Sequence, residues 1–408
     1  MTRRVLIFTY WFPPANVIGA SRPMAIARYF EKKGWRVTVV CGKSNAVSHD
    51  FTVGLDGIEV IYVPDTRITE FLNFKSGRGK LLRIISALLR VVALPDPFRS
   101  TVKRMYGAVR SESSGSDRFD LIVSSALPFS LHNSALQLGK DFNVPVILDN
   151  RDFWACSPYR RRVPLTCWLE RFVERRVFAR ADLVVAISEA MSDIYKIHYP
   201  DMAKKFIYVR NGTDTKVSAG KALAGGGGAK FVVTYTGILY GATRDLRPAL
   251  RAFQSLGIDV NVRFYGSEAE QIANYKREFS EIEISDCGRV SRDQALAAQR
   301  AADVLLIGLG TDQIEQSFLP GKFFEYVASG RPIVAIADKN SEIARLINRH
   351  GLGIASRVPE EIGEFVQALR NDLWVRSDRY MDELSRENQL DRLFEAASTL
   401  VEGRSGIE

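Results

Sequence analysis

The segment SFLPGKFFEYVASGRPIVA, residues 317–335, contains a helix-like stretch followed by a strand-like stretch. The rest of the chain repeats this alternation. Pro320 is suited to the first turn of a helix, and the apolar PIVA run that follows is typical of a buried strand. Lys322 and Glu325 are three residues apart and therefore share one face of that helix. The segment predicts a helix leading into a buried strand, with a lysine and a glutamate near its amino end.

The same alternation extends in both directions. Apolar runs rich in Val, Ile and aromatic residues alternate with helical stretches, and we expect strands at 4–10, 35–42, 58–64, 119–126, 144–150, 181–188, 205–212, 231–238, 260–266, 282–288, 303–310 and 332–337. Strands that are apolar on both faces and separated by helices imply parallel sheets covered on both sides. The fold class expected is α/β, with two doubly wound Rossmann-like domains facing across a cleft, where ligands bind beyond the carboxyl ends of the strands.

The length of 408 residues exceeds that of one ordinary domain. The four consecutive glycines of KVSAGKALAGGGGAK, residues 216–230, indicate a linker or loop. We expect an N-terminal acceptor-binding domain at 1–215 and a C-terminal nucleotide-binding domain at 216–385. From Pro359 onward we expect helices without intervening strands, and the last, 386–408, is a candidate to cross back onto the first domain.

The composition is that of a soluble globular protein, with 46% hydrophobic and 25% charged residues. Four cysteines with no CxxC pattern indicate neither a disulfide framework nor a zinc site, which favours a reducing cytoplasm. The apolar run near the N-terminus is too short for a signal peptide and ends at Pro13 and Pro14, so we interpret it as the first strand.

The net charge of +9 is concentrated in one region. Residues 67–110 hold ten basic and two acidic side chains, and within them GKLLRIISALLRVVAL, residues 79–94, places apolar residues at helical spacing. This stretch is too short and too charged to span a bilayer but suits an anionic membrane interface. The alternative is a helix packed on its own domain. We predict a peripheral protein on the inner face of the cytoplasmic membrane, with no nucleic-acid partner.

Cationic residues recur in the loops that connect a predicted strand to the following helix. Gly19 and Arg22 follow the first strand, where free helix amides and a guanidinium suit an anion, although an ordinary turn would look the same. Arg244 follows the first strand of the second half. Lys322 opposes the dipole of its helix unless an anionic ligand is bound, whereas the alternative is an exposed Lys–Glu pair of little energetic value.

Three motifs carry a family resemblance: FPPANVIGASRPMAIARYFEKKGWRVTVV, RNGTD and PGKFFEYVASGRPIVA. In this order they resemble the retaining nucleotide-sugar glycosyltransferases of family four, which have the two-domain GT-B fold. The resemblance implies a nucleoside-diphosphate sugar, with UDP or GDP, as donor. It implies Arg244 and Lys322 near the diphosphate, Glu325 at the ribose, and the Gly19 loop closing over the phosphates.

Two further residues are assigned through this resemblance. ALPFSLHNSAL is similar to a segment in which the family places a histidine beside the donor sugar, here His132, and Asp152 follows the next strand toward the same cleft. The implied catalytic set is His132, Asp152, Arg244 and Lys322, with no metal and no cofactor. Transfer with retention would pass through an oxocarbenium-like transition state, the protein chiefly supplying orientation and charge.

The sequence departs from the family pattern at two positions. Ser317 stands where the family commonly has a glutamate, with Glu315 close by, and Ile238 replaces the arginine of a Gly-Arg-Leu motif. The function implied is transfer of a sugar to a lipid-linked or surface-polysaccharide precursor. A sugar-nucleotide epimerase and a non-catalytic sugar-nucleotide-binding subunit remain as alternatives.

Overall fold

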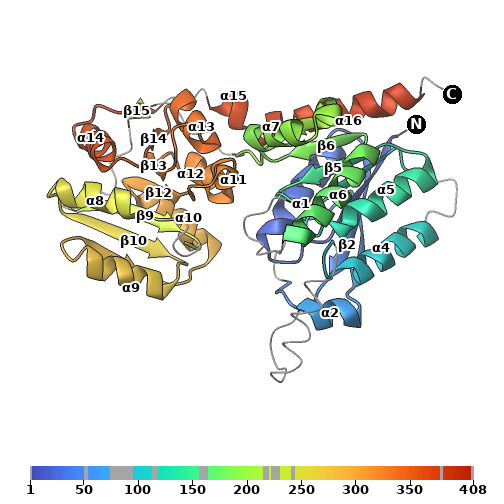
Figure 1. Ribbon diagram of the computed structural model, residues 1–408, viewed down its shortest axis with the longest axis horizontal. Helices are drawn as coiled ribbons and strands as arrows, with labels where there is room; N and C mark the ends of the chain where they lie inside the picture. The colour runs from blue at the N-terminus through green and yellow to red at the C-terminus, as the bar shows by residue number, and fades with distance from the viewer. Residues whose placement is uncertain are drawn as a thin grey trace. The chain divides into compact units, whose positions relative to one another are not determined.

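The computed structural model describes residues 2–49, 54–73, 95–112, 118–155, 164–214, 220–221, 230–239, 244–376 and 380–405. The chain divides into two compact units (Figure 1). The first contains Met1–Val209 and Leu390–Glu408, and the second contains Arg210–Gln389. The segment 79–94, which we interpret as an interfacial helix, lies outside the described residues.

The first unit is a parallel sheet covered by helices. Its described strands lie in the order β3-β2-β1-β4-β5-β6-β7. They are β1 (Arg4–Thr9), β2 (Arg36–Lys43), β3 (Ile58–Pro64), β4 (Leu121–Ser125), β5 (Val146–Asn150), β6 (Leu183–Ala186) and β7 (Phe206–Tyr208). The helices are η1 (Ile18–Ala20), α1 (Ser21–Lys32), α2 (Arg67–Asn73), α4 (Arg99–Glu112), α5 (Ser130–Phe142), α6 (Pro164–Arg180), α7 (Glu189–His198), η2 (Pro200–Lys205) and α16 (Arg386–Ser405).

The second unit repeats this plan, with strand order β11-β10-β9-β12-β13-β14. Its strands are β9 (Phe231–Thr236), β10 (Val260–Tyr265), β11 (Glu283–Asp286), β12 (Val304–Gly308), β13 (Ile333–Ile336) and β14 (Gly353–Ala355). The helices are α8 (Arg247–Ser255), α9 (Ala269–Glu278), α10 (Arg292–Ala301), α11 (Gln313–Gln316), α12 (Gly321–Ser329), α13 (Glu342–His350), α14 (Pro359–Arg370) and α15 (Met381–Leu384). The expectation of two doubly wound α/β domains is confirmed.

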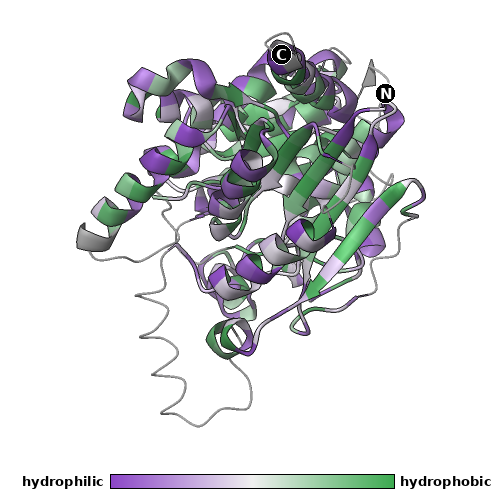
Figure 2. Cartoon of the chain, turned by 90° about the vertical axis from the view of Figure 1, so that its right-hand side faces the viewer, coloured by the Kyte–Doolittle hydropathy of each residue, from purple (hydrophilic) through white to green (hydrophobic). Residues whose placement is uncertain are grey.

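The strands form because their side chains are buried on both faces. Residues of β1, β4, β5, β12 and β13 are almost entirely inaccessible to solvent, as continuous runs of apolar residues in a covered parallel sheet should be. Serine caps fix several helix starts: Ser188 and Ser341 each accept a backbone N–H of the first turn, and Ser291 forms a capping box with Gln294. Figure 2 shows mainly hydrophobic strands and helices with one hydrophobic and one hydrophilic face.

The last helix belongs to the first unit. Leu390, Leu393, Ala397 and Val401 of α16 are buried in the hydrophobic core that also contains β1 and β2. Their spacing places them on one face of the helix, and that apolar face is covered by the first unit. Most of this helix, from Leu390 onward, is therefore part of the first unit (Figure 1).

The junction between the units lies between Val209 and Arg210, a few residues before the boundary expected at 215. Arg210 is 1% exposed and forms ion pairs with Glu342, at 2.7 Å, and with Glu383, at 2.9 Å. At Gly212, whose φ is +69°, a side chain would collide with the backbone of Arg386, since an added Cβ would lie 2.4 Å from its Cα. These contacts attach the RNGTD motif to the second unit.

Two features differ from the expectation for the C-terminal third. The prediction that no strand follows Pro359 is wrong, because β15 (Val375–Arg376) pairs antiparallel with β8 (Gly220–Lys221) in the glycine-rich segment. Strand β14 was also not expected, because its three residues begin with a glycine and are too few to show a period. In the part of the chain that the structure describes, no helix is long and apolar enough to cross a bilayer.

Candidate functional site

Both sheets reverse their strand order at the same place, between the first and fourth strands of each unit. In the first unit the neighbours are β1 and β4, and in the second they are β9 and β12. Ligands of doubly wound sheets bind at this switch point, beyond the carboxyl ends of the strands. The two candidate site regions therefore follow β1, β4 and β5 in the first unit, and β9 and β12 in the second.

In the second unit, β9 ends at Gly237, which has φ of +94°. This left-handed conformation favours glycine, and the place of a Cβ there would be 3.6 Å from Nζ of Lys322. The loop is fixed by a bond from the Gly237 N–H to the Tyr265 carbonyl, 2.7 Å, and by one from the Ser267 hydroxyl to the Gly237 carbonyl, 2.8 Å. Gly237 thus brings the end of β9 close to the lysine.

Lys322 lies in the first turn of α12, whose N-cap residue, Pro320, makes no side-chain capping bond. Its Nζ atom lies 3.6 Å from the centroid of the Tyr235 ring, a cation–π contact. Within the described parts of the chain, no carboxylate lies within ion-pair distance of Lys322. Burial and, next, the charge of Arg244 lower the pKa of Lys322 well below its usual value. An anion bound here would reverse that effect.

Glu325 follows one turn later and remains accessible. Its carboxylate accepts a bond from the Gln299 amide at 3.4 Å and lies 3.6 Å from the Arg292 guanidinium. The same Gln299 amide donates to the Thr236 hydroxyl at the end of β9, at 3.1 Å, and Thr236 is also bonded to Tyr326 of α12. Glu325 is therefore held in the network that joins α12 to the β9 terminus.

Arg244 is not an isolated cation. Its guanidinium lies 3.3 Å from Glu315, and both side chains are buried. Glu315 was named from the sequence only as a neighbour of Ser317, whose hydroxyl instead donates to the Ile314 carbonyl at 2.7 Å. The pair neutralises Arg244 locally but leaves its charge close enough to affect Lys322. A diphosphate contact by Arg244 stays a prediction.

In the first unit, Arg22 makes a buried ion pair. Its Nη2 atom lies 2.7 Å from Oδ1 of Asp149, its Nε atom is 3.0 Å from both carboxylate oxygens, and Nη2 also donates to the Val209 carbonyl. Asp149 further accepts from Ser125 at 2.7 Å. Burial raises the pKa of Asp149, but Arg22 outweighs it and the pKa is lowered overall. Arg22 is paired with this carboxylate, and its role as a phosphate ligand stays a prediction.

The loop carrying Gly19 is held by an arginine that the sequence reasoning missed. Arg151 donates to the carbonyls of Gly19 and Ala126. A Cβ at Gly19 would lie 3.1 Å from the Trp11 ring and 3.3 Å from the Arg151 guanidinium, so a side chain there would require one of them to move slightly. Asp152 follows Arg151 in this turn and contributes to the field around its guanidinium. The catalytic role of Asp152 stays a prediction.

His132 is enclosed in the first unit, with no exposed surface. Its ring nitrogens are 2.9 Å from the Ser124 hydroxyl and 2.7 Å from the Asn150 side-chain oxygen. Burial lowers the pKa of His132 to about 4, so the ring is neutral at pH 7. Burial and two hydrogen bonds hold the neutral His132 ring against the end of β5, and its place beside the donor sugar stays a prediction.

No group of three or more His, Cys, Asp or Glu side chains in the described ranges is arranged to hold a metal ion. Lys322, Glu325 and Arg244 are brought together in the second unit. Gly19, Arg22, His132 and Asp152 lie around the switch point of the first.

Residues 19–212 match the family model of the glycosyl transferase 4-like domain. No curated protein sequence matches the chain significantly. The matched residues cover the first unit from the Gly19 loop to the RNGTD motif, so the match includes the Arg22–Asp149 pair and the enclosed histidine.

Solved structures match over nearly the full length of both chains. HepE from Anabaena, in complex with UDP, has a TM-score of 0.63 and 14% identity, over 97% of this chain and 100% of that one. A glycosyltransferase from Rickettsia africae has a TM-score of 0.61 and 10% identity, over 98% and 99%. The lipopolysaccharide outer core galactosyltransferase WaaB, in its apo form, has a TM-score of 0.61 and 12% identity, over 97% and 99%.

Proposed function

Residues 19–212 form a glycosyl transferase 4-like domain in a chain with the GT-B fold, and from that premise we propose that the protein transfers a sugar from a UDP-sugar to a membrane-associated glycan precursor. The observation that carries the donor assignment is Lys322: a lowered-pKa ammonium at a helix amino terminus and a switch point, with no carboxylate partner in the described residues. HepE, solved with UDP, supports uracil as the base of the donor nucleotide.

The diphosphate would lie against the start of α12. Lys322 and the backbone amides of the first turn would bind its oxygens, with Arg244 adding charge and Glu325 accepting from the ribose hydroxyls. In the reaction the bond between the anomeric carbon and the phosphate oxygen breaks, and the electron pair leaves with the UDP. An acceptor hydroxyl oxygen bonds to that carbon and its proton goes to the leaving phosphate. Fixed cations stabilise the charge that develops on the diphosphate.

We propose that this exchange takes place with retention of the anomeric configuration, on the strength of the family-four resemblance alone. Proton coupling constants of the purified product test it, and an inverted product would reject it. Turnover of the nucleotide sugar in the absence of any acceptor would instead identify an epimerase.

A membrane location is supported by α6. Trp168 and Phe172 are exposed by 63% and 44%, and their rings are stacked with centroids 6.1 Å apart. The Arg176 guanidinium lies 4.2 Å from the centroid of the Phe172 ring. Exposed aromatic rings one turn apart beside arginines suit the headgroup region of an anionic bilayer, and the WaaB similarity is consistent with a glycan acceptor made at a membrane.

Thermal stabilisation by a panel of UDP-, GDP-, ADP- and dTDP-sugars tests the donor assignment, because a ligand that binds only the folded protein stabilises it by about 2.7 kcal/mol at one hundred times its Kd. We expect UDP-sugars to give the largest shift, and equal shifts for all four bases would contradict the choice of uracil. Co-sedimentation with anionic vesicles, compared with neutral ones, tests the location. Trp168→Ala with Phe172→Ala should reduce it, and failure of the parent protein to co-sediment at low salt would refute it.

A further inference from the structure

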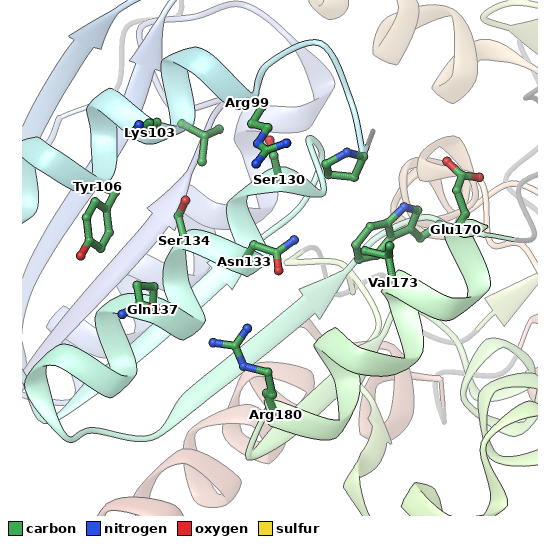
Figure 3. A pocket seen from close by; sticks show the side chains of 13 residues that line it. Arg99, Lys103, Tyr106, Ser130, Asn133, Ser134, Gln137, Glu170, Val173 and Arg180 are labelled. Carbon is green, nitrogen blue, oxygen red and sulfur yellow. The ribbon is translucent and has the colours of Figure 1, made fainter. Parts of the chain in front are cut away.

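A groove of about 740 Å³ lies on the first unit between α4, α5 and α6 (Figure 3). Its size is within the range of sites that enclose small ligands. Six lining residues matter for its chemistry: Arg99, Lys103, Asn133, Ser134, Trp154 and Arg180. The groove belongs to the first unit alone and contains none of the residues assigned to the donor.

The cations of this groove are uncompensated. Arg99, Lys103 and Arg180 have neither an ion pair nor a hydrogen bond to any described part of the chain. Neighbouring arginines of the same helices are engaged: Arg104 of α4 donates to the Pro64 carbonyl, and Arg175 of α6 pairs with Asp201 at 2.8 Å. Three unpaired cations around one hollow create a positive field that favours an anion.

One carboxylate also lines the groove, Glu170 of α6, which is 1% exposed and already has a partner. It offsets at most one of the three positive charges. The lining therefore keeps a net positive charge even with Glu170 ionised.

A buried aromatic ring forms part of the groove wall. Trp154 is 1% exposed and stacks on Phe129 with ring centroids 4.9 Å apart. Its Nε1 atom is inaccessible to solvent and has no hydrogen bond to the described residues. Because that atom is enclosed, Trp154 contributes a rigid wall to the groove and not a hydrogen-bond donor for a ligand.

Uncharged polar groups complete the lining. The Asn133 amide and the Ser134 hydroxyl of α5 make no hydrogen bond to the described residues. In Figure 3 the Asn133 side chain lies between the guanidinium groups of Arg99 and Arg180 in this view. Amides and hydroxyls beside an aromatic ring suit sugar hydroxyls, and guanidinium groups suit phosphate oxygens.

We propose that this groove binds a phosphorylated saccharide, and that it is the site for the phosphate-bearing end of the acceptor. The second clause rests on the proposed glycosyltransferase function. Arg99, Lys103 and Arg180 bind the phosphate, while Asn133 and Ser134 bind the sugar. The same chemistry occurs in a soluble sugar phosphate and in a sugar joined to an isoprenyl lipid through a diphosphate.

Calorimetric titration of the full chain without nucleotide tests the site. The probes are N-acetylglucosamine 1-phosphate, the uncharged methyl glycoside of that sugar, inorganic diphosphate, and the same sugar on a short isoprenyl diphosphate. We expect the sugar phosphate to bind and the methyl glycoside not to bind. Arg99→Ala with Arg180→Ala should weaken binding by about tenfold or more, since two charged contacts to the phosphate are lost.

Arg176→Ala is the matched control, because Arg176 is on α6 but its guanidinium lies over Phe172 outside the groove. It should leave the affinity unchanged. Asn133→Leu, which keeps every charge, should weaken the sugar phosphate but not inorganic diphosphate. If the isoprenyl probe binds more tightly than the sugar phosphate, the natural ligand is lipid-linked. If the two bind equally, the natural ligand is a soluble sugar phosphate. Either result supports the proposed site.

Absence of binding by both N-acetylglucosamine 1-phosphate and the sugar on the isoprenyl diphosphate would overturn the proposal. Equal affinities for inorganic diphosphate and the sugar phosphate would also overturn it. Loss of affinity in Arg176→Ala equal to that in the double variant would also overturn it. UDP-sugar binding, measured separately on the same variants, keeps the two proposals distinct. A protein that binds the sugar phosphate but no nucleotide sugar would refute the donor assignment and leave the groove as a binding site.

Discussion

The two units have the same strand order at their switch points, but a buried cation there has a carboxylate partner in the first unit and none in the described residues of the second. In the first unit, Arg22 is matched by Asp149 at 2.7 Å, and both side chains are buried. In the second, Lys322 has an aromatic ring beside it, no carboxylate partner in the described chain, and a lowered pKa. A paired buried charge stabilises a particular packing, whereas an unpaired one is costly unless a ligand binds.

The comparison separates these cations by the carboxylate partners that the described residues give them. A position after a strand and a basic side chain are common to Arg22, Arg244 and Lys322. The neutralising residue distinguishes them: Asp149 fully engages Arg22, Glu315 partly balances Arg244, and Lys322 has none in the described residues. Loss of the carboxylate partner should thus damage the first unit, and loss of the lysine should damage binding alone.

The largest expected effect is on the buried pair. Asp149→Ala leaves the Arg22 guanidinium buried without its carboxylate, which should reduce the free energy of unfolding by about 3 to 5 kcal/mol. Denaturant titration measures this loss. Arg22→Met combined with Asp149→Leu removes both charges and should recover most of it. Equal destabilisation by the single and double variants would show that the pair is not the source of the effect.

Lys322→Met should weaken ligand binding without reducing stability, the opposite of what Asp149→Ala should do. Removal of a charge-assisted contact should weaken UDP binding by about 1.5 to 3 kcal/mol, which is roughly tenfold to more than a hundredfold. The melting temperature should stay the same or rise, because a partly buried ammonium without a carboxylate is replaced by an apolar side chain. Lys339→Met, at an exposed lysine paired with Glu361, is the control and should leave UDP affinity unchanged. A variant that unfolds while losing affinity would contradict the comparison.

Glu325→Gln should have a smaller effect that depends on the ribose. Replacing an ionised acceptor by a neutral one should cost about 0.5 to 1.5 kcal/mol in UDP affinity. The loss should vanish when the ligand is 2′,3′-dideoxy-UDP, because the hydroxyls that Glu325 accepts from are then absent. Calorimetry with both nucleotides measures this, and an equal loss for both would place Glu325 away from the ribose.

The smallest expected effect is a proton taken up on binding. The pKa of Lys322 is lowered in the free protein, and a bound diphosphate should raise it. Between these two pKa values, binding of UDP-glucose should take up as much as about one proton, and affinity should fall as the pH rises above the lower one. Calorimetry in buffers of different ionisation enthalpy measures the uptake. Uptake that persists in Lys322→Met would assign the proton to another group.

The sequence predicted the helix that carries Lys322 and Glu325 because its signals are local. Pro320 at the helix start, Lys322 and Glu325 one turn apart and the apolar strand that follows all depend on residues close in the chain, and α12 and β13 form there. Gly237 was likewise indicated by the end of an apolar run. The contacts of Tyr235 and Gln299 with α12 were not predictable, since both residues reach this helix from distant parts of the chain. The proximity of Arg244 to Lys322 was implied by the family resemblance.

The sequence alone determined two doubly wound sheets, their approximate limits and a basic residue after a strand in each, because apolar periodicity and turn residues act over a few positions. Tertiary structure decided which cation is neutralised. Asp149 is 127 residues from Arg22, and Glu315 is 71 from Arg244. It also enclosed His132 and brought α4, α5 and α6 around one groove. Burial and charge pairing depend on neighbours that are distant in the sequence and meet only in the folded chain, so a local sequence pattern cannot predict them.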